Sequence, residues 1–322
     1  MEINYLNTLC RICISIFKFF IDNIWYKSLP KFKNIRFKDM LIFVIKTVLT
    51  AAGRGTRLLP FTKEMPKEMM PIFTKIHDNQ RVVIPLLQYV FEQFYSMKIR
   101  DFCFVVGRDK RSIEDHFTPH QNYINELSGY HKKTLSNFYK KLENCNLMWV
   151  NQDKPLGFGD AVKRAEKFVG DEDFILQAGD VSIISRYKHP ILRLIDTAKK
   201  NPDVSAILVC KKVKDAKRYG IIQIKNRSSQ VYFVEGVEEK PIKPRSNLGI
   251  LALYYFKPEI FHSLKKTKRG KNNELQLTDG IQQMINDGKK VLAIPLAKDD
   301  VEIDVGTVES YRDAQDSSYK RA

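Results

Sequence analysis

The pattern of apolar and polar residues changes near residue 41, and from there it switches repeatedly between two periods. Residues 41–51 are an almost continuous apolar run, which is typical of a strand buried on both faces of a parallel sheet. Within residues 86–98, apolar side chains recur at the spacing of a helix that covers a core. The chain from residue 41 onward is therefore predicted to alternate strands with helices.

The same reading extends to the rest of the chain. Predicted strands are residues 41–51, 102–106, 147–150, 174–178, 204–209 and 290–295, with a run of strands and turns over 219–256. Predicted helices are 86–98, 110–117, 158–168, 190–199, 278–287 and 307–317, with a helical insertion at about 118–145. This order predicts an α/β fold with a Rossmann-like mixed, mainly parallel sheet flanked by helices. In such sheets, ligands bind at the carboxyl ends of the strands.

Residues 1–45 differ from the rest and are predicted to form an N-terminal extension of unknown role, ahead of one large domain over 46–322. Three interpretations stay open for this extension. It is a variable segment packed on the core, an amphipathic helix at a membrane surface, or a stretch that precedes a natural start at Met40. Charged residues interrupt its apolar runs, which leaves no span of about 18 uncharged residues for a transmembrane helix.

Composition is that of an ordinary globular protein. Hydrophobic residues make up 43% of the 322 residues and charged residues 28%, which excludes collagen, a low-complexity tract and a disordered acidic chain. Five cysteines in a chain of this length do not indicate a disulfide scaffold. Cys10 and Cys13 form one C-x-x-C without a second pair at zinc-ribbon spacing. We therefore expect a cytoplasmic protein with reduced cysteines.

The net charge of +17 requires nucleic acid to be considered as a partner. The sequence contains no long basic run and no C2H2 or basic-zipper spacing. Dispersed lysine equally suits an enzyme that handles polyanionic phosphate substrates. We expect a phosphate-bearing small-molecule substrate rather than a nucleic acid, and no membrane partner.

The strongest motif is TVLTAAGRGTRLLPFTKEMPKEMMP at residues 47–71. A buried strand leads into Gly53 and Gly55, whose backbone N–H groups can approach an anion closely. Arg57 and Lys67 can then neutralise phosphate oxygens. Because Leu replaces the third glycine and no Gly-Lys-Ser/Thr closes the loop, this is neither a dinucleotide fingerprint nor a P-loop.

This segment resembles the nucleotide-binding signature of the sugar-1-phosphate nucleotidylyltransferases. Within that family, GxGTR followed by the PKEM stretch is closest to the bacterial-type UTP–glucose-1-phosphate uridylyltransferases. The resemblance recurs from Lys46 to about Asp316 and implies a nucleotide-diphospho-sugar transferase type of fold, with a nucleotidylyltransferase catalytic domain over 46–322.

A loop after the strand at 147–150 suits a pyrimidine base. The amide of Gln152 offers both a donor and an acceptor, and Gly157 lets backbone groups reach the base. The resemblance implies that these two residues read the base. It also implies that Ala52, Gly53 and Gly55 bind the nucleotide.

Two aspartates are candidates for a Mg²⁺ site. Asp180 ends a predicted buried strand, and Mg²⁺ takes few protein carboxylates while phosphates and water complete its shell. The resemblance implies that Asp180 and Asp304 share the metal. On its own, Asp304 could instead cap the helix near Thr307.

A second group of motifs resembles the sugar-phosphate half of the family's site. Gly220 leaves room for a sugar ring, Glu239 can accept hydrogen bonds from hydroxyls, and Lys240 can hold the phosphate. Asn247 falls where the family places another sugar contact. Further on, Glu274 is a candidate to approach the sugar, and Thr278 is predicted to cap the helix that follows.

The resemblance implies a reaction of UTP with glucose 1-phosphate that gives UDP-glucose and pyrophosphate, with Mg²⁺ as cofactor. Arg57, Lys67, Asp180 and Lys240 would carry the catalysis. Glucose-1-phosphate thymidylyl transfer, broad specificity and a non-catalytic nucleotide-sugar-binding protein stay open as alternatives. Members of the family often form homo-oligomers, so we expect one here.

Overall fold

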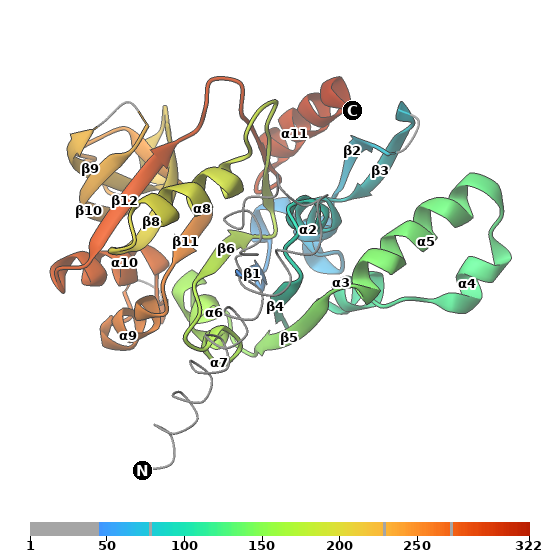
Figure 1. The fold of residues 1–322 in the computed structure, drawn as a ribbon, viewed down its shortest axis with the longest axis horizontal. Coiled ribbons are helices and arrows are strands. Elements are labelled where there is room, and N and C mark those ends of the chain that lie inside the picture. Colours follow the sequence, from blue (N-terminus) through green and yellow to red (C-terminus); the bar gives the residue numbers. More distant parts are fainter. Residues whose placement is uncertain (1–44, 77–78, 228–229, 271–272) are drawn as a thin grey trace, which may run out of the picture. The chain divides into compact units, whose positions relative to one another are not determined.

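The computed structural model describes residues 45–322 except 77–78, 228–229 and 271–272, so the interpretations of residues 1–44 and of Met40 lie outside the described residues. Within the described part, nine strands form one sheet in the order β5-β4-β1-β6-β11-β8-β12-β10-β9 (Figure 1). Their bounds are β1 Lys46–Ala51, β4 Asp101–Gly107, β5 Asn146–Gln152, β6 Phe174–Ala178, β8 Val204–Lys212, β9 Gly220–Arg227, β10 Tyr232–Glu239, β11 Leu248–Phe256 and β12 Lys290–Pro295.

The sheet is mixed, as predicted, and its parallel part is concentrated at one side. Strands β5, β4, β1 and β6 lie side by side and parallel, and β12 is parallel to β8. Strands β11 and β10 run antiparallel to their neighbours. The fold class of a mixed α/β sheet is therefore confirmed.

Helices cover both faces of this sheet because successive residues of a buried strand point to opposite sides. One face packs on α2 (Leu86–Ser96), α3 (Arg111–His116), α5 (Gly129–Glu143) and α8 (Pro190–Lys200). The other face packs on α6 (Phe158–Arg164), α7 (Glu166–Val169), α9 (Glu259–Lys266) and α10 (Leu277–Asn286). In β11, Leu253 and Tyr255 belong to the first layer, while Tyr254 and Phe256 belong to the second.

Two small antiparallel sheets were not predicted. Strands β2 (Pro71–Lys75) and β3 (Arg81–Pro85) form a hairpin, on which the C-terminal helix α11 (Val308–Arg321) packs through an edge-to-face contact of Tyr319 with Phe73. Strands β7 (Val181–Ile184) and β13 (Val301–Asp304) form the other pair. The second pair matters for function because it carries Asp304 to the end of β6.

The segment 118–145 contains α4 (Gln121–Glu126) and α5, which Figure 1 shows projecting from the side of the sheet that ends in β5. The predicted helix at 158–168 is two helices, because the chain leaves α6 at Ala165 and starts again as α7. In the described part of the chain, no helix is long and apolar enough to cross a membrane.

Candidate active site

The residues that the motifs singled out converge on one cavity of about 960 Å³ at the carboxyl ends of the parallel strands. Its lining includes these predicted residues: Ala52, Gly53, Gly55, Arg57, Lys67, Gln152, Gly157, Asp180, Gly220, Glu239, Lys240 and Asp304. Asn247 is exposed and is not part of the lining. It lies just before β11, where its carbonyl oxygen accepts a hydrogen bond from Val213 N.

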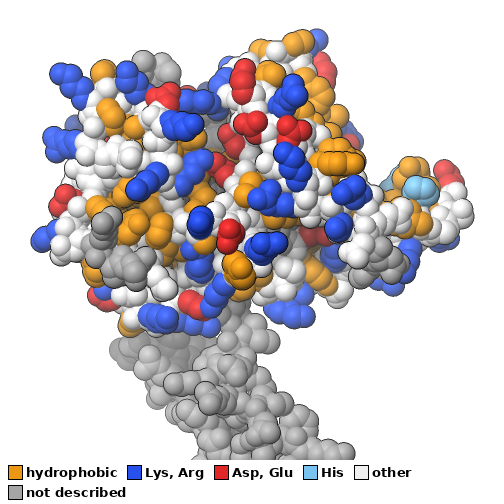
Figure 2. All heavy atoms as spheres, turned by 90° about the horizontal axis from the view of Figure 1, so that it is seen from above, with side chains coloured by type: hydrophobic (Ala, Val, Ile, Leu, Met, Phe, Trp, Pro, Cys, Tyr) orange, Lys and Arg blue, Asp and Glu red, His pale blue; other side chains and the backbone are white. Residues whose placement is uncertain are grey.

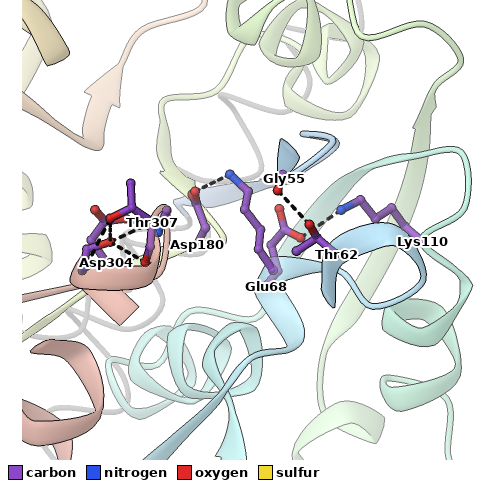
Figure 3. A network of polar contacts seen from close by, with 10 residues as sticks. Gly55, Thr62, Glu68, Lys110, Asp180, Asp304 and Thr307 are labelled. Atoms are coloured by element: carbon purple, nitrogen blue, oxygen red, sulfur yellow. Dashed lines mark hydrogen bonds and ion pairs between the residues drawn. The ribbon is translucent and has the colours of Figure 1, made fainter. Parts of the chain in front are cut away.

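The loop after β1 turns sharply and brings two arginines to the cavity. Gly55 has a φ of 67°, a left-handed conformation that favours glycine, and its carbonyl accepts a hydrogen bond of 2.8 Å from Thr62 Oγ1 (Figure 3). Arg54 and Arg57 line the cavity on either side of this turn. Neither has an ion-pair partner among the residues that the structure describes. Both guanidinium groups are therefore available to an anionic ligand.

Lys67 and Asp180 both line the cavity and form a half-buried ion pair, in which each side chain is 15% exposed. Burial lowers the pKa of the Lys67 ammonium, but the carboxylates of Asp180 and Glu68 outweigh burial and hold the pKa above its usual value. Burial likewise opposes the ionised form of Asp180, and the charge and hydrogen bond of Lys67 keep the pKa of Asp180 below its usual value. Both groups are thus charged at neutral pH.

A second ion pair lies behind this one. Lys110, which precedes α3, contacts the carboxylate of Glu68 at 3.2 Å, as Figure 3 shows. Glu68 follows Lys67 directly in the short 3-10 helix Lys67–Met69, and its side chain is buried. Burial raises the pKa of Glu68, and the nearby ammonium groups of Lys110 and Lys67 oppose that rise. The pair anchors the turn that presents Lys67.

The carboxylate of Asp304 lies near that of Asp180. Asp304 pairs with Val181 across β13 and β7, and the next residue, Val305, donates its N–H to the Asp180 carbonyl at 3.2 Å. Burial and the charge of Asp180 raise the pKa of Asp304. Two neighbouring carboxylates are a donor set that suits a divalent cation with phosphate ligands. In the part of the chain that the structure describes, no group of three or more His, Cys, Asp and Glu side chains is arranged to hold a metal.

The alternative role of Asp304 as a helix cap does not hold. Thr307 caps α11 itself, in a capping box with Ser310, and Figure 3 shows Asp304 at the turn that leads into it. Asp304 Oδ1 instead accepts a hydrogen bond of 2.8 Å from Gly306 N. This bond fixes the carboxylate in the turn before the helix.

Gln152 and Gly157 lie together at the other side of the cavity. Gln152 is the last residue of β5, and its Nε2 donates to the Gly157 carbonyl at 3.1 Å. Gly157 has a φ of 104°, and a Cβ there would lie 2.5 Å from the Leu275 carbonyl oxygen. Only glycine fits this close approach. The base-reading loop of the prediction is therefore packed against the segment that leads into α10.

The sugar-side residues are brought together by the hairpin of β9 and β10. Gly220 and Glu239 are directly paired across the two strands. The carboxylate of Glu239 accepts from Lys240 Nζ at 2.9 Å and from Thr278 Oγ1 at 2.7 Å. The prediction that Thr278 caps α10 is wrong, because the cap is Gln276 and the Thr278 hydroxyl is committed to Glu239.

Sequence reasoning missed Glu302, which lines the cavity, and Lys110, which holds the cavity residue Glu68 from behind. Glu302 forms an ion pair with Lys211. Because side chains alternate along the strand Val301–Asp304, Glu302 and Asp304 lie on the same side of it. This alternation could have identified Glu302 as a cavity residue once the strand was recognised. Lys110 gave no such signal, since its partner Glu68 is 42 residues away.

The chain is similar to known proteins over nearly all of the described residues. The model of the family described as nucleotidyl transferase matches residues 46–321. A UTP–glucose-1-phosphate uridylyltransferase of Bacillus subtilis (strain 168) is 38% identical over 255 residues, which is 78% of this chain and 83% of that protein. The crystal structure of an apo UDP-glucose pyrophosphorylase covers 86% of this chain and 98% of its own, with 31% identity and a TM-score of 0.76. A UDP-glucose pyrophosphorylase complexed with UDP-glucose covers 86% of this chain and 99% of its own, with 31% identity and a TM-score of 0.73. The chain therefore belongs to the nucleotidyl transferase family.

Proposed function

We propose that this protein is a UTP–glucose-1-phosphate uridylyltransferase, which makes UDP-glucose and pyrophosphate. The observation that carries the proposal is one cavity that gathers the amide of Gln152, two arginines without an ion-pair partner among the described residues, the half-buried Lys67 and the carboxylates of Asp180, Asp304 and Glu239. The relatives and solved structures named for this activity support it. Uridylyl transfer uses each of these groups.

The reaction is an in-line displacement at phosphorus. An oxygen of the sugar phosphate attacks the α-phosphorus of UTP, a new P–O bond forms, and the bond to the β-phosphate oxygen breaks as pyrophosphate leaves. The attacking phosphate is already ionised, so no general base is needed. Because both reactants are anions, catalysis consists of positioning and charge neutralisation.

The cations have distinct places along this path. Lys67, whose raised pKa keeps it protonated, lines the cavity beside Asp180, and we assign it to the α-phosphate. Arg57, in the glycine loop, is assigned to the leaving pyrophosphate. Lys240 is held by Glu239 beside Gly220 and is assigned to the phosphate of the attacking sugar. Each lowers the repulsion between the two reactants.

Asp180 and Asp304 would hold Mg²⁺, which when bound supplies positive charge to the triphosphate oxygens. In the structure the Asp180 carboxylate accepts from Lys67, so a bound metal would share this residue with the lysine. Glu302 stays paired with Lys211 and is not assigned to the metal. Gln152 and Gly157 are assigned to the base, and Gly220 and Glu239 to the sugar.

Pyrophosphate release by the purified protein, with glucose 1-phosphate and Mg²⁺, tests the proposal. UTP and dTTP are supplied in parallel, since uracil and thymine differ by one methyl group, which an apolar pocket distinguishes by only ~1–3 kcal/mol. We expect turnover with UTP to exceed that with dTTP. Equal or faster turnover with dTTP would assign the protein to thymidylyl or broad-specificity transfer. No release with either nucleotide would contradict the proposed reaction.

The proposal also implies a location and an assembly. UTP and glucose 1-phosphate are cytoplasmic metabolites, so we propose that the protein acts in the cytoplasm. We expect a homo-oligomer, which sedimentation equilibrium of the full chain measures directly.

A further inference from the structure

The amide of Gln152 is held by two oxygen acceptors at once. Its Nε2 donates to the Gly157 carbonyl at 3.1 Å and to Asp160 Oδ2 at 2.9 Å. Gln152 is 4% exposed and Asp160 7% exposed, so water does not compete freely for these bonds. Asp160 has no role in the function proposed so far.

Both acceptors can only accept, and this fixes the orientation of the amide. A carbonyl oxygen has no proton to donate. Asp160 forms ion pairs with Arg164 Nε at 3.5 Å and Arg269 Nη2 at 3.9 Å, and an ionised carboxylate accepts hydrogen bonds without donating any. If the amide flipped, its oxygen would face two oxygens and both hydrogen bonds would be lost. The two Nε2 protons are therefore committed within the protein.

Asp160 itself is rigidly placed. It lies in the first turn of α6, next to Gly159, whose N–H donates to the Leu275 carbonyl at 2.8 Å. A Cβ at Gly159 would lie 2.9 Å from that same carbonyl oxygen, so the start of the helix is packed directly on the backbone of 275–276. This packing fixes the backbone of Asp160 beside Gln152, and the two arginines and the Gln152 amide hold its carboxylate.

The remaining polar atom of the Gln152 side chain is Oε1, an acceptor, on a residue that lines the cavity. Uracil and thymine carry an N–H at ring position 3, which can donate to Oε1. Cytosine carries an unprotonated acceptor nitrogen at that position, which would repel it. A freely rotating glutamine would serve either base equally well.

We propose that Asp160 is a positioning residue that locks Gln152 as an acceptor, so that the site selects uracil or thymine nucleotides over cytosine nucleotides. This inference rests on the proposed function, because it takes the cavity to bind a pyrimidine nucleoside triphosphate. It adds a residue and a basis for specificity, and it leaves the choice between uracil and thymine to other contacts.

The test compares UTP with CTP in Asp160→Asn, Asp160→Ala and the unmodified full chain. Asparagine keeps the volume of aspartate but can present either an oxygen or an NH₂ group, so only the Gly157 carbonyl still opposes a flip of Gln152. Dissociation constants are measured by titration with each nucleotide in the presence of Mg²⁺, and kcat/KM is measured with glucose 1-phosphate. We expect the preference for UTP over CTP to fall ~10-fold or more in both variants, the effect of about one hydrogen bond. The KM for glucose 1-phosphate should not change.

Asp153→Ala is the matched control. Asp153 is exposed and forms an ion pair with the same Arg164 at 2.7 Å, but it has no hydrogen bond to Gln152. Its removal should leave the UTP preference intact, which separates the loss of an arginine partner from the loss of the lock.

Three outcomes would overturn the inference. In one, the unmodified protein binds UTP and CTP equally. In another, the Asp160 variants lose affinity for both nucleotides in the same proportion, which indicates a purely structural role. In the third, neither nucleotide binds the unmodified protein, and then the proposed function fails as well. The first two outcomes leave uridylyl transfer standing, so the two failures are distinguishable.

Discussion

At the scale of single residues, Lys67 is the group on which the proposed chemistry depends most. It is half-buried, forms an ion pair with Asp180, and has its pKa raised by the charges of Asp180 and Glu68. We expect Lys67→Ala to lower turnover by ~100-fold or more, by analogy with the loss of one preorganised oxyanion donor. Initial rates of pyrophosphate release at saturating UTP and glucose 1-phosphate measure this loss.

Lys63→Ala is the control for this substitution. Lys63 belongs to the same segment, but its side chain is 77% exposed and its ion-pair partner, Glu64, is 83% exposed. Its rate should match that of the unmodified protein. Turnover of Lys67→Ala near the original value, with circular dichroism unchanged, would refute the assignment of Lys67 to the α-phosphate.

Asp180→Asn tests the metal site at the same scale. The amide keeps the shape of the carboxylate but loses the charge that attracts a divalent cation. We expect turnover at millimolar Mg²⁺ to fall by ~100-fold or more, as for the loss of other transition-state charge stabilisation. A Mg²⁺ titration of activity is the measurement, and exposed Asp299→Asn is the control. A variant with an unaltered Mg²⁺ dependence would remove Asp180 from the site.

At the scale of elements, Gly157 allows the start of α6 to pack closely against the segment before α10. A methyl group there would meet the Leu275 carbonyl, on a backbone whose φ of 104° disfavours any side chain. We expect Gly157→Ala to lower the free energy of unfolding by ~2–5 kcal/mol, from backbone strain and overpacking together. It should also raise the KM for UTP, because the loop that carries the Gln152 contact moves.

Gly288→Ala separates the cost of backbone strain from the cost of the steric clash with Leu275. Gly288 also has a positive φ, 75°, but no atom lies within 4 Å of its Cβ position. It should cost only ~1–2 kcal/mol and leave the KM unchanged. Urea unfolding of both variants gives the comparison, and equal losses would mean that the contact with Leu275 does not constrain the loop.

His189 caps a helix and makes the free energy of unfolding depend on pH. It caps α8, where its Nδ1 accepts from Ile191 N at 3.2 Å while its Nε2 donates to the Ile183 carbonyl at 2.9 Å. Burial lowers the pKa of this imidazole in the folded protein. The unfolded chain, with a pKa near ~6.5, therefore takes up the proton first as pH falls. The contribution of His189 to stability is complete above that pH and is lost as pH falls through the folded pKa.

Two substitutions separate these effects. His189→Ala should lose ~1–2 kcal/mol at pH 8, because the cap is removed. His189→Asn should keep the cap and show a smaller loss of stability between pH 8 and pH 5, because asparagine does not titrate. Urea unfolding at both pH values measures this, with exposed His131→Asn as the control. An Asn variant with the original pH dependence would exclude a contribution from His189.

The elements with strong apolar patterns were predictable, and those without were not. Strands such as β1 and β8 are buried on both faces and read as continuous apolar runs. The hairpin of β2 and β3 is short, partly exposed and bounded by Pro71 and Pro85, so nothing in its pattern indicated strands. Thr278 was wrongly placed as a cap because its partner, Glu239, is remote in sequence.

For the site, motifs predicted which residues line the cavity but not what holds them. Gln152 was predictable from its loop, whereas its orientation depends on a carboxylate eight residues later and on two arginines. Buried partners of this kind depend on how helices pack against one another, and the distances that result from this packing cannot be read from a single sequence.

At the scale of the whole molecule, positive charge is spread rather than concentrated. Figure 2 shows Lys and Arg side chains across the visible face with Asp and Glu among them. This distribution fits the interpretation of the +17 charge as a general attraction for phosphate-bearing substrates. The cavity adds the specific contacts.

The sheet also couples the two sides of the site mechanically. Each central strand alternates between two core layers, as Ile207 and Leu208 do in β8, so neither layer can separate without disrupting the strands. Strand β6, which leads to Asp180, is paired directly with β11 on its other side. We call the strands β5, β4, β1 and β6 the nucleotide half and the strands from β11 to β9 the sugar half. We therefore expect these two halves to unfold as one unit.

Two buried cysteines report on these halves separately. Cys103 lies in β4, in the parallel part of the sheet, and Cys210 lies in β8, on the other side of β11. Both side chains are fully buried, and burial raises the pKa of each thiol to about 12. Labelling of each thiol along a urea series, read by mass spectrometry, should give one shared midpoint. UTP with Mg²⁺ at ~100 times its dissociation constant should stabilise both by ~2.7 kcal/mol, because a ligand of the folded state protects everything that unfolds with its site. Mg²⁺ alone is the control. Labelling of Cys210 at a lower urea concentration than Cys103, or protection of only one of them by UTP, would mean that the two halves unfold independently. In that case the tight packing of Gly157 on Leu275 would not transmit the effect of UTP binding from one half to the other.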